Sequence, residues 1–205
     1  MPAPAVLRDV FQALREEWGE EDEGYTFENG PPPVDRLDVM VHRAQEHTAT
    51  TAFATIGMAA HPMPAPGGPA VDGPASVPTP EERAELRLFR RGPLPPADEG
   101  RLATRLANLA AYPWTRGHPL GWGELVGFDD ELPAFPGCRT LFLAGPWLTG
   151  QPATVETGVG PVRVLNAVPV SDEERQRARE TRPETFFSDL LDTRDILAPP
   201  PVTRP

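Results

Sequence analysis

The chain has little cysteine, and its apolar residues form no long uninterrupted run. Cys138 is the single cysteine among 205 residues, which excludes an internal disulfide and a cysteine-rich zinc site. The N-terminal segment 1–21 has no basic cluster followed by a continuous apolar stretch. We therefore expect neither a signal peptide nor a transmembrane helix, and the expected compartment is the cytoplasm.

Positive charge is also scarce. The 19 basic residues face 30 acidic residues, which gives a formal net charge of −11. Nucleic acids and anionic membranes repel such a chain, so we expect no nucleic-acid partner and no membrane partner. The charge is compatible with a basic protein partner, and equally with the solubility that surface charge provides.

The common catalytic signatures are missing. The glycines of the segment 117–128 lack the Lys-Ser/Thr pair and the strand-to-helix setting of a phosphate-binding loop. The patterns G-x-S-x-G and H-E-x-x-H do not occur either. We therefore expect no cofactor, and binding is favoured over catalysis.

A small metal- or thiol-dependent enzyme is the alternative function, and it would use His42, His61, His118 or Cys138. No two of these histidines have the spacing of metal ligands on one helix, so ordinary surface or hydrogen-bonded histidines are the competing interpretation. Cys138 has no base beside it in the sequence, and a small buried apolar residue is its competing interpretation.

Hydrophobic periodicity predicts grouped strands rather than a strict alternation of strands and helices. Apolar residues at helical spacing or helix-capping signals predict helices at 5–18, 97–114, 171–180 and 183–192. Alternating or β-branched residues predict strands at 36–43, 48–58, 79–91, 139–145 and 160–170. The expected fold class is α+β, in a single domain with a mixed, mostly antiparallel sheet and flanking helices.

Local signals refine three of these helices. Pro113 is expected to end the helix that starts at residue 97, because proline disrupts helical hydrogen bonding. Ser171 and Glu174 have the spacing of a capping box at the start of the next helix. The last helix is expected to bury four apolar side chains, Phe186, Phe187, Leu190 and Leu191.

Proline is abundant, with 28 residues in the chain and seven of them between residues 59 and 80. We divide the chain into an N-terminal helix and acidic linker at 1–33, a folded domain at 34–197 and a loose tail at 198–205. Residues 59–80 are expected to form a flexible insertion within the domain. Deleting residues 62–78 is then expected to leave the fold intact.

The order of the segments resembles the Suppressor of fused domain. The series begins with RLDVMVHR, a strand ending in ATIGMAAHPM, and RAELRLF. It continues with LANLAAYP, GHPLGWG, RTLFLAG and VRVLNAVPVSDEE, and it ends with FFSDLLD and TRDIL. The resemblance covers residues 34–197 and identifies the chain as similar to bacterial single-domain members.

This resemblance implies a protein-binding function. Animal members of the family are non-enzymatic regulators that hold a transcription factor by capturing a short peptide as an added strand, and they carry a second domain. Bacterial single-domain relatives resemble immunity proteins, which bind and neutralise a toxin. The implied partner is therefore a protein, either a basic toxin domain or an extended peptide.

Four residues are the candidates for partner contact: Tyr112, Trp114, His118 and Trp122. Aromatic side chains on a glycine-punctuated loop are typical interface anchors. The resemblance implies that Tyr112 lies near the peptide-binding face and that His118 belongs to a Gly-x-His-like stretch of the relatives. Gly117 stands where relatives often have Asp, so the resemblance does not imply the animal peptide specificity for this chain.

Two alternatives stay open at this face. Trp114 and Trp122 would have a purely structural role if they cap the core. The acidic loop 129–131 is the next candidate for partner contact if the aromatic face is wrong.

Overall fold

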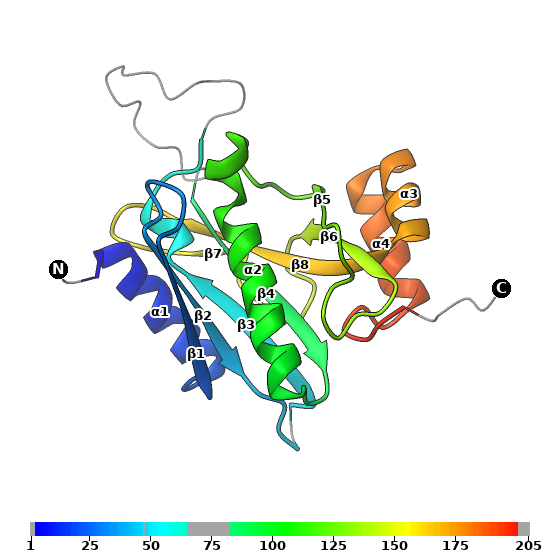
Figure 1. Ribbon diagram of the computed structural model, residues 1–205, viewed down its shortest axis with the longest axis horizontal. Helices are drawn as coiled ribbons and strands as arrows, with labels where there is room; N and C mark the ends of the chain where they lie inside the picture. The colour runs from blue at the N-terminus through cyan, green and yellow to red at the C-terminus, as the bar shows by residue number, and fades with distance from the viewer. Residues whose placement is uncertain (1–2, 47, 65–82, 201–205) are drawn as a thin grey trace.

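The computed structural model describes residues 3–46, 48–64 and 83–200. Its strands join in one sheet (Figure 1), whose path is β1-β2-β3-β4-β8-β6-β5, with β7 paired to β8. The strands are β1 Glu23–Glu28, β2 Arg36–His42, β3 Thr50–Ile56, β4 Ala84–Arg91, β5 Leu125–Gly127, β6 Cys138–Ala144, β7 Thr154–Val155 and β8 Val162–Ser171. Among these pairs only β4 and β8 run parallel, so the predicted α+β class with a mixed, mostly antiparallel sheet is confirmed.

The described helices cover both faces of the sheet. They are α1 Ala5–Trp18, the short 3₁₀ helix η1 Met58–Ala60, α2 Pro96–Arg116, α3 Asp172–Glu180 and α4 Pro183–Thr193. In Figure 1, α2 crosses in front of the sheet, α1 lies at one end, and α3 and α4 lie together at the other end beyond β6. Among these helices, none is long and apolar enough to cross a membrane.

Burial on both faces follows from the alternation of side chains along a strand. In β3, Phe53 packs in the cluster that includes Leu102 and Leu106 of α2. The next residue, Ala54, packs in a second cluster with Val10 of α1. The central strand β3 is therefore buried on both sides.

The helix α2 runs further than the sequence predicts. It continues past Pro113 to Arg116 and ends where Gly117 adopts the left-handed conformation, with φ of 64°. Pro113 lies in the last turn, where its missing N–H removes only one hydrogen bond, and its side chain is buried. The expectation that Pro113 ends the helix was therefore wrong, and Trp114 is a helical residue.

Two further details differ from the sequence predictions. β1 was not predicted, because only Tyr25 and Phe27 mark its half-buried face and an acidic run precedes it. Leu191 was expected to be buried, but its side chain is 38% exposed on the outer face of α4. Phe186, Phe187 and Leu190 do pack in the core cluster at this end of the sheet.

The start of the proline-rich segment belongs to the fold. Residues 58–60 form η1, and Met63 is only 3% exposed within the main core cluster. Residues 65–82 lie outside the described residues, as do residues 201–205 of the tail. A deletion that starts at residue 62 would remove a core side chain, so the deletion proposed from the sequence is badly placed.

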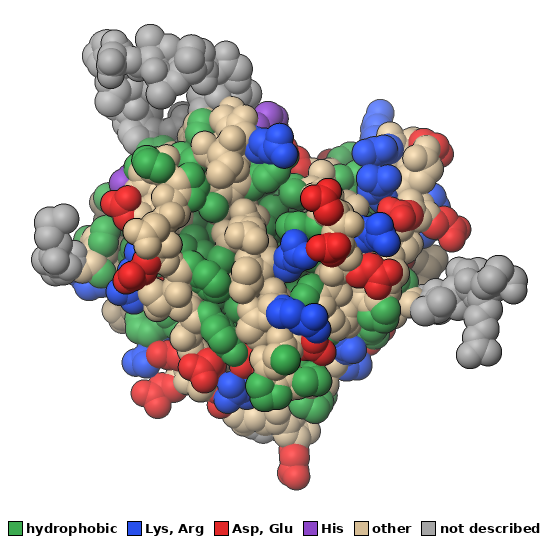
Figure 2. Space-filling view, in the orientation of Figure 1, with side chains coloured by type: hydrophobic (Ala, Val, Ile, Leu, Met, Phe, Trp, Pro, Cys, Tyr) green, Lys and Arg blue, Asp and Glu red, His purple; other side chains and the backbone are tan. Residues whose placement is uncertain are grey.

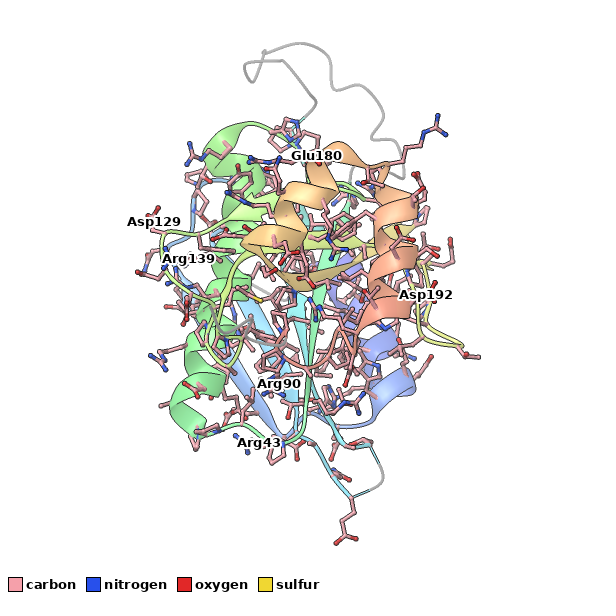
Figure 3. The ribbon with its side chains drawn as sticks, turned by 90° about the vertical axis from the view of Figure 1, so that its right-hand side faces the viewer. Arg43, Arg90, Asp129, Arg139, Glu180 and Asp192 are labelled. Carbon is pink, nitrogen blue, oxygen red and sulfur yellow. The ribbon has the colours of Figure 1, made fainter. Side chains whose placement is uncertain are left out.

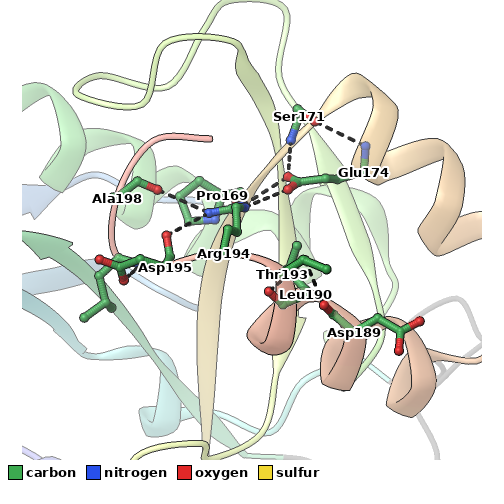
Figure 4. A network of polar contacts seen from close by, with 10 residues as sticks. Pro169, Ser171, Glu174, Asp189, Leu190, Thr193, Arg194, Asp195 and Ala198 are labelled. Atoms are coloured by element: carbon green, nitrogen blue, oxygen red, sulfur yellow. Dashed lines mark hydrogen bonds and ion pairs between the residues drawn. The ribbon is translucent and has the colours of Figure 1, made fainter. Parts of the chain in front are cut away.

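A buried ion pair fixes the C-terminal helices (Figure 4). Arg194 donates to Glu174 from Nε at 2.6 Å and from Nη2 at 3.1 Å, and both side chains are less than a tenth exposed. The same guanidinium donates to the carbonyl of Pro169 in β8 at 2.7 Å. Glu174 also completes the predicted capping box with Ser171. One network thus joins α3, the end of α4 and β8.

Candidate partner-binding face

The four predicted contact residues lie on the end of α2 and on the segment that follows it. Tyr112 and Trp114 belong to the last turns of α2, are half-buried and pack against the main core cluster. His118 and Trp122 are exposed and belong to residues 117–124, which we call the 117–124 loop. This loop leads from α2 into β5 (Figure 1).

The backbone at the start of the loop is fixed by the helix cap. The N–H of Gly117 bonds to the carbonyl of Pro113, and the N–H of His118 donates to the same carbonyl at 3.2 Å. Such a left-handed cap satisfies carbonyls that the helix end leaves free. The direction in which the loop leaves α2 is therefore set locally.

Leu120 anchors the middle of the loop in the core. Its side chain is 1% exposed, and its N–H donates to the Sδ of Met63 at 3.4 Å. Its carbonyl accepts a 3.0 Å hydrogen bond from Nη2 of Arg163 in β8. Met63 is a contact that sequence reasoning missed, since nothing in a proline-rich run marks one residue as buried.

Glu124 closes the loop on itself. Its Oε2 accepts a 2.6 Å hydrogen bond from the N–H of Gly121, and its Oε1 lies 3.2 Å from Nδ1 of His118. Sequence reasoning singled out His118 and missed Glu124, because an acid six residues away has no signature of its own. The pair orients the exposed imidazole.

Gly123 lets the loop approach α4 closely. Its φ is +88°, and a Cβ at this position would lie 2.6 Å from Cγ of Pro183, the first residue of α4. Its N–H donates to the carbonyl of Leu143 in β6 at 2.8 Å. Gly123 is thus required both by its backbone conformation and by the lack of space.

Trp122 lies between these two fixed points. Trp122 is 46% exposed. Leu120 on one side and Gly123 on the other are held by hydrogen bonds to the sheet. The arrangement presents an indole ring to solvent from a backbone that is already ordered. Tyr112 and Trp114 support this face from α2, where Arg116 lies over the Tyr112 ring at 5.8 Å.

Gly57 and Met58 form the turn that the sequence marks with a Gly-Met pair, a few residues before Met63. Gly57 has φ of +142°, and a Cβ there would lie 2.8 Å from the carbonyl oxygen of Arg36. Glu85 of β4 is fully buried and accepts 2.9 Å hydrogen bonds from the N–H groups of Gly57 and Ala59. Burial raises the pKa of Glu85 to about 7 despite these donors.

The residues of the alternative enzyme do not assemble into a site. Burial lowers the pKa of His42, which stacks edge-on against Trp18, and burial also lowers the pKa of His61. Burial raises the pKa of Cys138 to about 12, so its thiol stays protonated at neutral pH. Within the described part of the chain, no three His, Cys, Asp or Glu side chains are grouped to hold a metal ion.

The acidic loop 129–131 is a second exposed feature near α2. Asp129 projects outward from it (Figure 3), and the exposed Asp130 lies 3.4 Å from Nη2 of Arg105. On the face shown in Figure 2, acidic and basic side chains are interspersed around this region. The mixture of signs makes it a less distinctive surface than the 117–124 loop.

Comparisons with known proteins point to one family. The family model for Suppressor of fused protein (SUFU) matches residues 33–201. No curated protein matches the chain. The match covers the whole sheet except β1, together with α2, α3 and α4.

Solved structures share the fold at low identity. A SUFU homolog from Neisseria gonorrhoeae aligns with a TM-score of 0.62 at 15% identity, covering 93% of this chain and 91% of its own. The Sufu–Fu complex gives 0.59 at 13% identity, covering 96% of this chain and 86% of the other. Drosophila Suppressor of Fused gives 0.58 at 14% identity and covers 94% of this chain, which spans only 46% of the Drosophila chain.

Proposed function

Since the chain belongs to the Suppressor of fused protein (SUFU) family, we propose that it is a cytoplasmic protein-binding module whose partner docks on the 117–124 loop. The observation that carries this proposal is Trp122, which is 46% exposed on a loop whose backbone is fixed on both sides. A ring held in this way loses little conformational freedom on binding. Tryptophan is also among the residues that contribute most to binding energy when a partner buries them.

The partner is a protein in this proposal. The Sufu–Fu structure is a complex of that relative with a protein partner. The resemblance of bacterial single-domain relatives to immunity proteins favours a toxin as the partner of this chain. A net charge of −11 favours fast encounter with a basic toxin domain. An extended peptide is the other partner class that the resemblance supports.

The proposal assigns no catalytic role to the chain. A thiol nucleophile must be ionised and accessible, whereas Cys138 is fully buried with its pKa raised to about 12. His118 has a carboxylate neighbour in Glu124, but both belong to the proposed contact loop. We infer that this pair orients the loop surface for binding.

Capture of the partner tests the proposal. The tagged full chain is incubated with extract of its source cells, and bound proteins are identified by mass spectrometry and compared between the parent and Trp122→Ala. Leu148→Ala is the matched control, because Leu148 is a similarly exposed apolar residue, at 43%, on another loop. We expect a protein retained by the parent and by Leu148→Ala and depleted with Trp122→Ala; equal recovery with all three would contradict the assigned face.

A further inference from the structure

β1 leaves one edge of the sheet open. Within the described residues, β1 ends the strand path and pairs with β2 on one side only. Figure 1 shows it at the margin of the sheet. The opposite end of the path is β5, beside the 117–124 loop. The β1 edge is therefore a surface separate from the proposed binding face.

The edge strand is regular. Its six residues pair with β2 in unbroken register, from Glu23 opposite Val41 to Glu28 opposite Arg36. Neither a bulge nor a proline interrupts it, and these are two of the devices by which proteins block an edge strand. An edge without these two devices presents backbone N–H and C=O groups that an extended chain can bond.

A buried polar contact holds β1 in place. The hydroxyl of Tyr25 donates to Oε1 of Glu99 in α2 at 2.9 Å. Arg43 binds the same carboxylate through both of its oxygens, at 2.8 and 2.9 Å, and the Glu99 side chain is only 2% exposed. The strand is thus ordered before any partner arrives, which lowers the cost of adding another strand.

Both ends of this edge are acidic. Glu23 and Glu28 are exposed, and they lie on opposite faces of the sheet because they are five positions apart. Two cations lie nearby, and each is bound to another carboxylate. Arg43 is held by the buried glutamate of α2 and lies 3.6 Å from Glu23, while Arg36 forms a 3.1 Å ion pair with Asp38.

These charges determine which partner charge suits the edge. A strand added to this edge would place one residue directly opposite Glu23 and another directly opposite Glu28. Like charges directly opposite across a strand pair are destabilising. The same two positions favour a partner strand that carries basic residues.

We propose that the β1 edge binds an extended basic segment of another protein as an added antiparallel strand, with arginines opposite Glu28 and Glu23. Between them, alternate partner residues would meet the half-buried rings of Phe27 and Tyr25 on the α2 face. β-Branched apolar residues suit those two positions, and threonine suits the positions opposite Thr26 and Gly24. The segment with this pattern is Arg-Val-Thr-Val-Thr-Arg.

A peptide titration of the full-length ¹⁵N-labelled chain tests the proposal. The probe is acetyl-Arg-Val-Thr-Val-Thr-Arg-amide, and its control carries glutamate in place of both arginines. We expect the basic probe to shift the amide resonances of residues 23–28 and to bind about tenfold more tightly than the acidic control at low salt. The difference in affinity between the two peptides should decrease as salt is added. Equal affinities, or shifts confined to other residues, would overturn the proposal.

Charge reversal locates the site. The double variant Glu23→Arg, Glu28→Arg should prefer the acidic peptide, with a melting temperature that shows the fold is retained. Trp122→Ala should bind the basic peptide like the parent, because that residue lies at the other end of the sheet. An unchanged preference in the double variant, or loss of the probe with Trp122→Ala, would contradict the proposal without bearing on partner capture by the loop.

Discussion

The buried carboxylate of Glu85 accepts a 2.9 Å hydrogen bond from the backbone N–H of Gly57. The N–H of Ala59 bonds to the same oxygen, and the hydroxyl of Thr55 donates to the other oxygen at 2.5 Å. This one side chain therefore fixes the turn that leaves β3. The chain continues from that turn to Met63, which lies under Leu120 of the 117–124 loop.

Glu85 makes stability depend on pH. Its folded-state pKa is raised from 4.5 to about 7 by burial, so its stabilising contribution is fully present below pH 4.5 and is lost as pH rises through 7. Glu85→Gln keeps the shape and imitates the protonated acid. We expect the unfolding free energy of the parent to fall relative to the variant by up to about 3 kcal/mol between pH 4.5 and 8.

Urea unfolding of both proteins at several pH values measures this difference. The comparison with Glu85→Gln cancels the contributions of the other acids. If the unfolding free energy of the parent minus that of the variant does not change with pH, Glu85 has an ordinary pKa. If this difference rises with pH, the turn stabilises the carboxylate of Glu85.

Gly57→Ala should be strongly destabilising. The residue has φ of +142°, and the new Cβ would lie 2.8 Å from the Arg36 carbonyl oxygen and 3.0 Å from Cα of Leu37. We expect a loss of about 2–4 kcal/mol in unfolding free energy. Gly145→Ala is the control, since a Cβ there meets nothing within 4 Å, and it should change stability by less than about 0.5 kcal/mol. Similar melting temperatures for the two variants would refute the argument.

Met63→Ala should loosen the 117–124 loop. The substitution leaves a cavity below Leu120 and removes the sulfur that its N–H contacts, at a cost of about 2–4 kcal/mol. Hydrogen exchange should accelerate more in residues 117–124 than in α3. Met40→Ala, in the cluster on the α1 side of the sheet, should not show this local preference. A uniform change across the chain would mean that Met63 supports the core without positioning the loop.

Arg194→Met should test the ion pair of Figure 4. It leaves the carboxylate of Glu174 buried without its cation, and such losses cost about 3–5 kcal/mol. Arg101→Met removes an exposed pair with Asp98 and should cost less than about 0.5 kcal/mol. Chemical denaturation of both variants measures the two losses of unfolding free energy. Equal small losses would show that the buried ion pair contributes no more to stability than a surface ion pair.

The sequence predicted most of the long elements because their apolar residues are periodic. Leu102, Leu106 and Leu109 of α2 are all buried, as their helical spacing indicates. β1 was not predicted because two half-buried aromatic residues are too few to show the alternation of a strand. The prediction that Pro113 ends the helix was wrong because the effect of a proline depends on its position. In the last turn, Pro113 removes a single backbone hydrogen bond.

The candidate face was only partly accessible from sequence. Aromatic residues after a helix marked the region, but the contacts that order it join distant segments. Met63 meets Leu120, and Pro183 meets Gly123. The burial of Glu85 was equally hidden, because an acid flanked by apolar residues in a strand usually faces solvent. Such pairings are set by tertiary packing and leave no local pattern.

The affinity of the captured partner for Trp122→Ala tests the central claim most directly. Isothermal titration would compare the parent, Trp122→Ala and Leu148→Ala, with the melting temperature of each protein as the control for folding. The account predicts that Trp122→Ala binds about thirtyfold more weakly, a loss of about 2 kcal/mol, while it melts like the parent. Parent-like affinity and parent-like melting of Trp122→Ala would contradict the account and move the contact to the acidic loop 129–131.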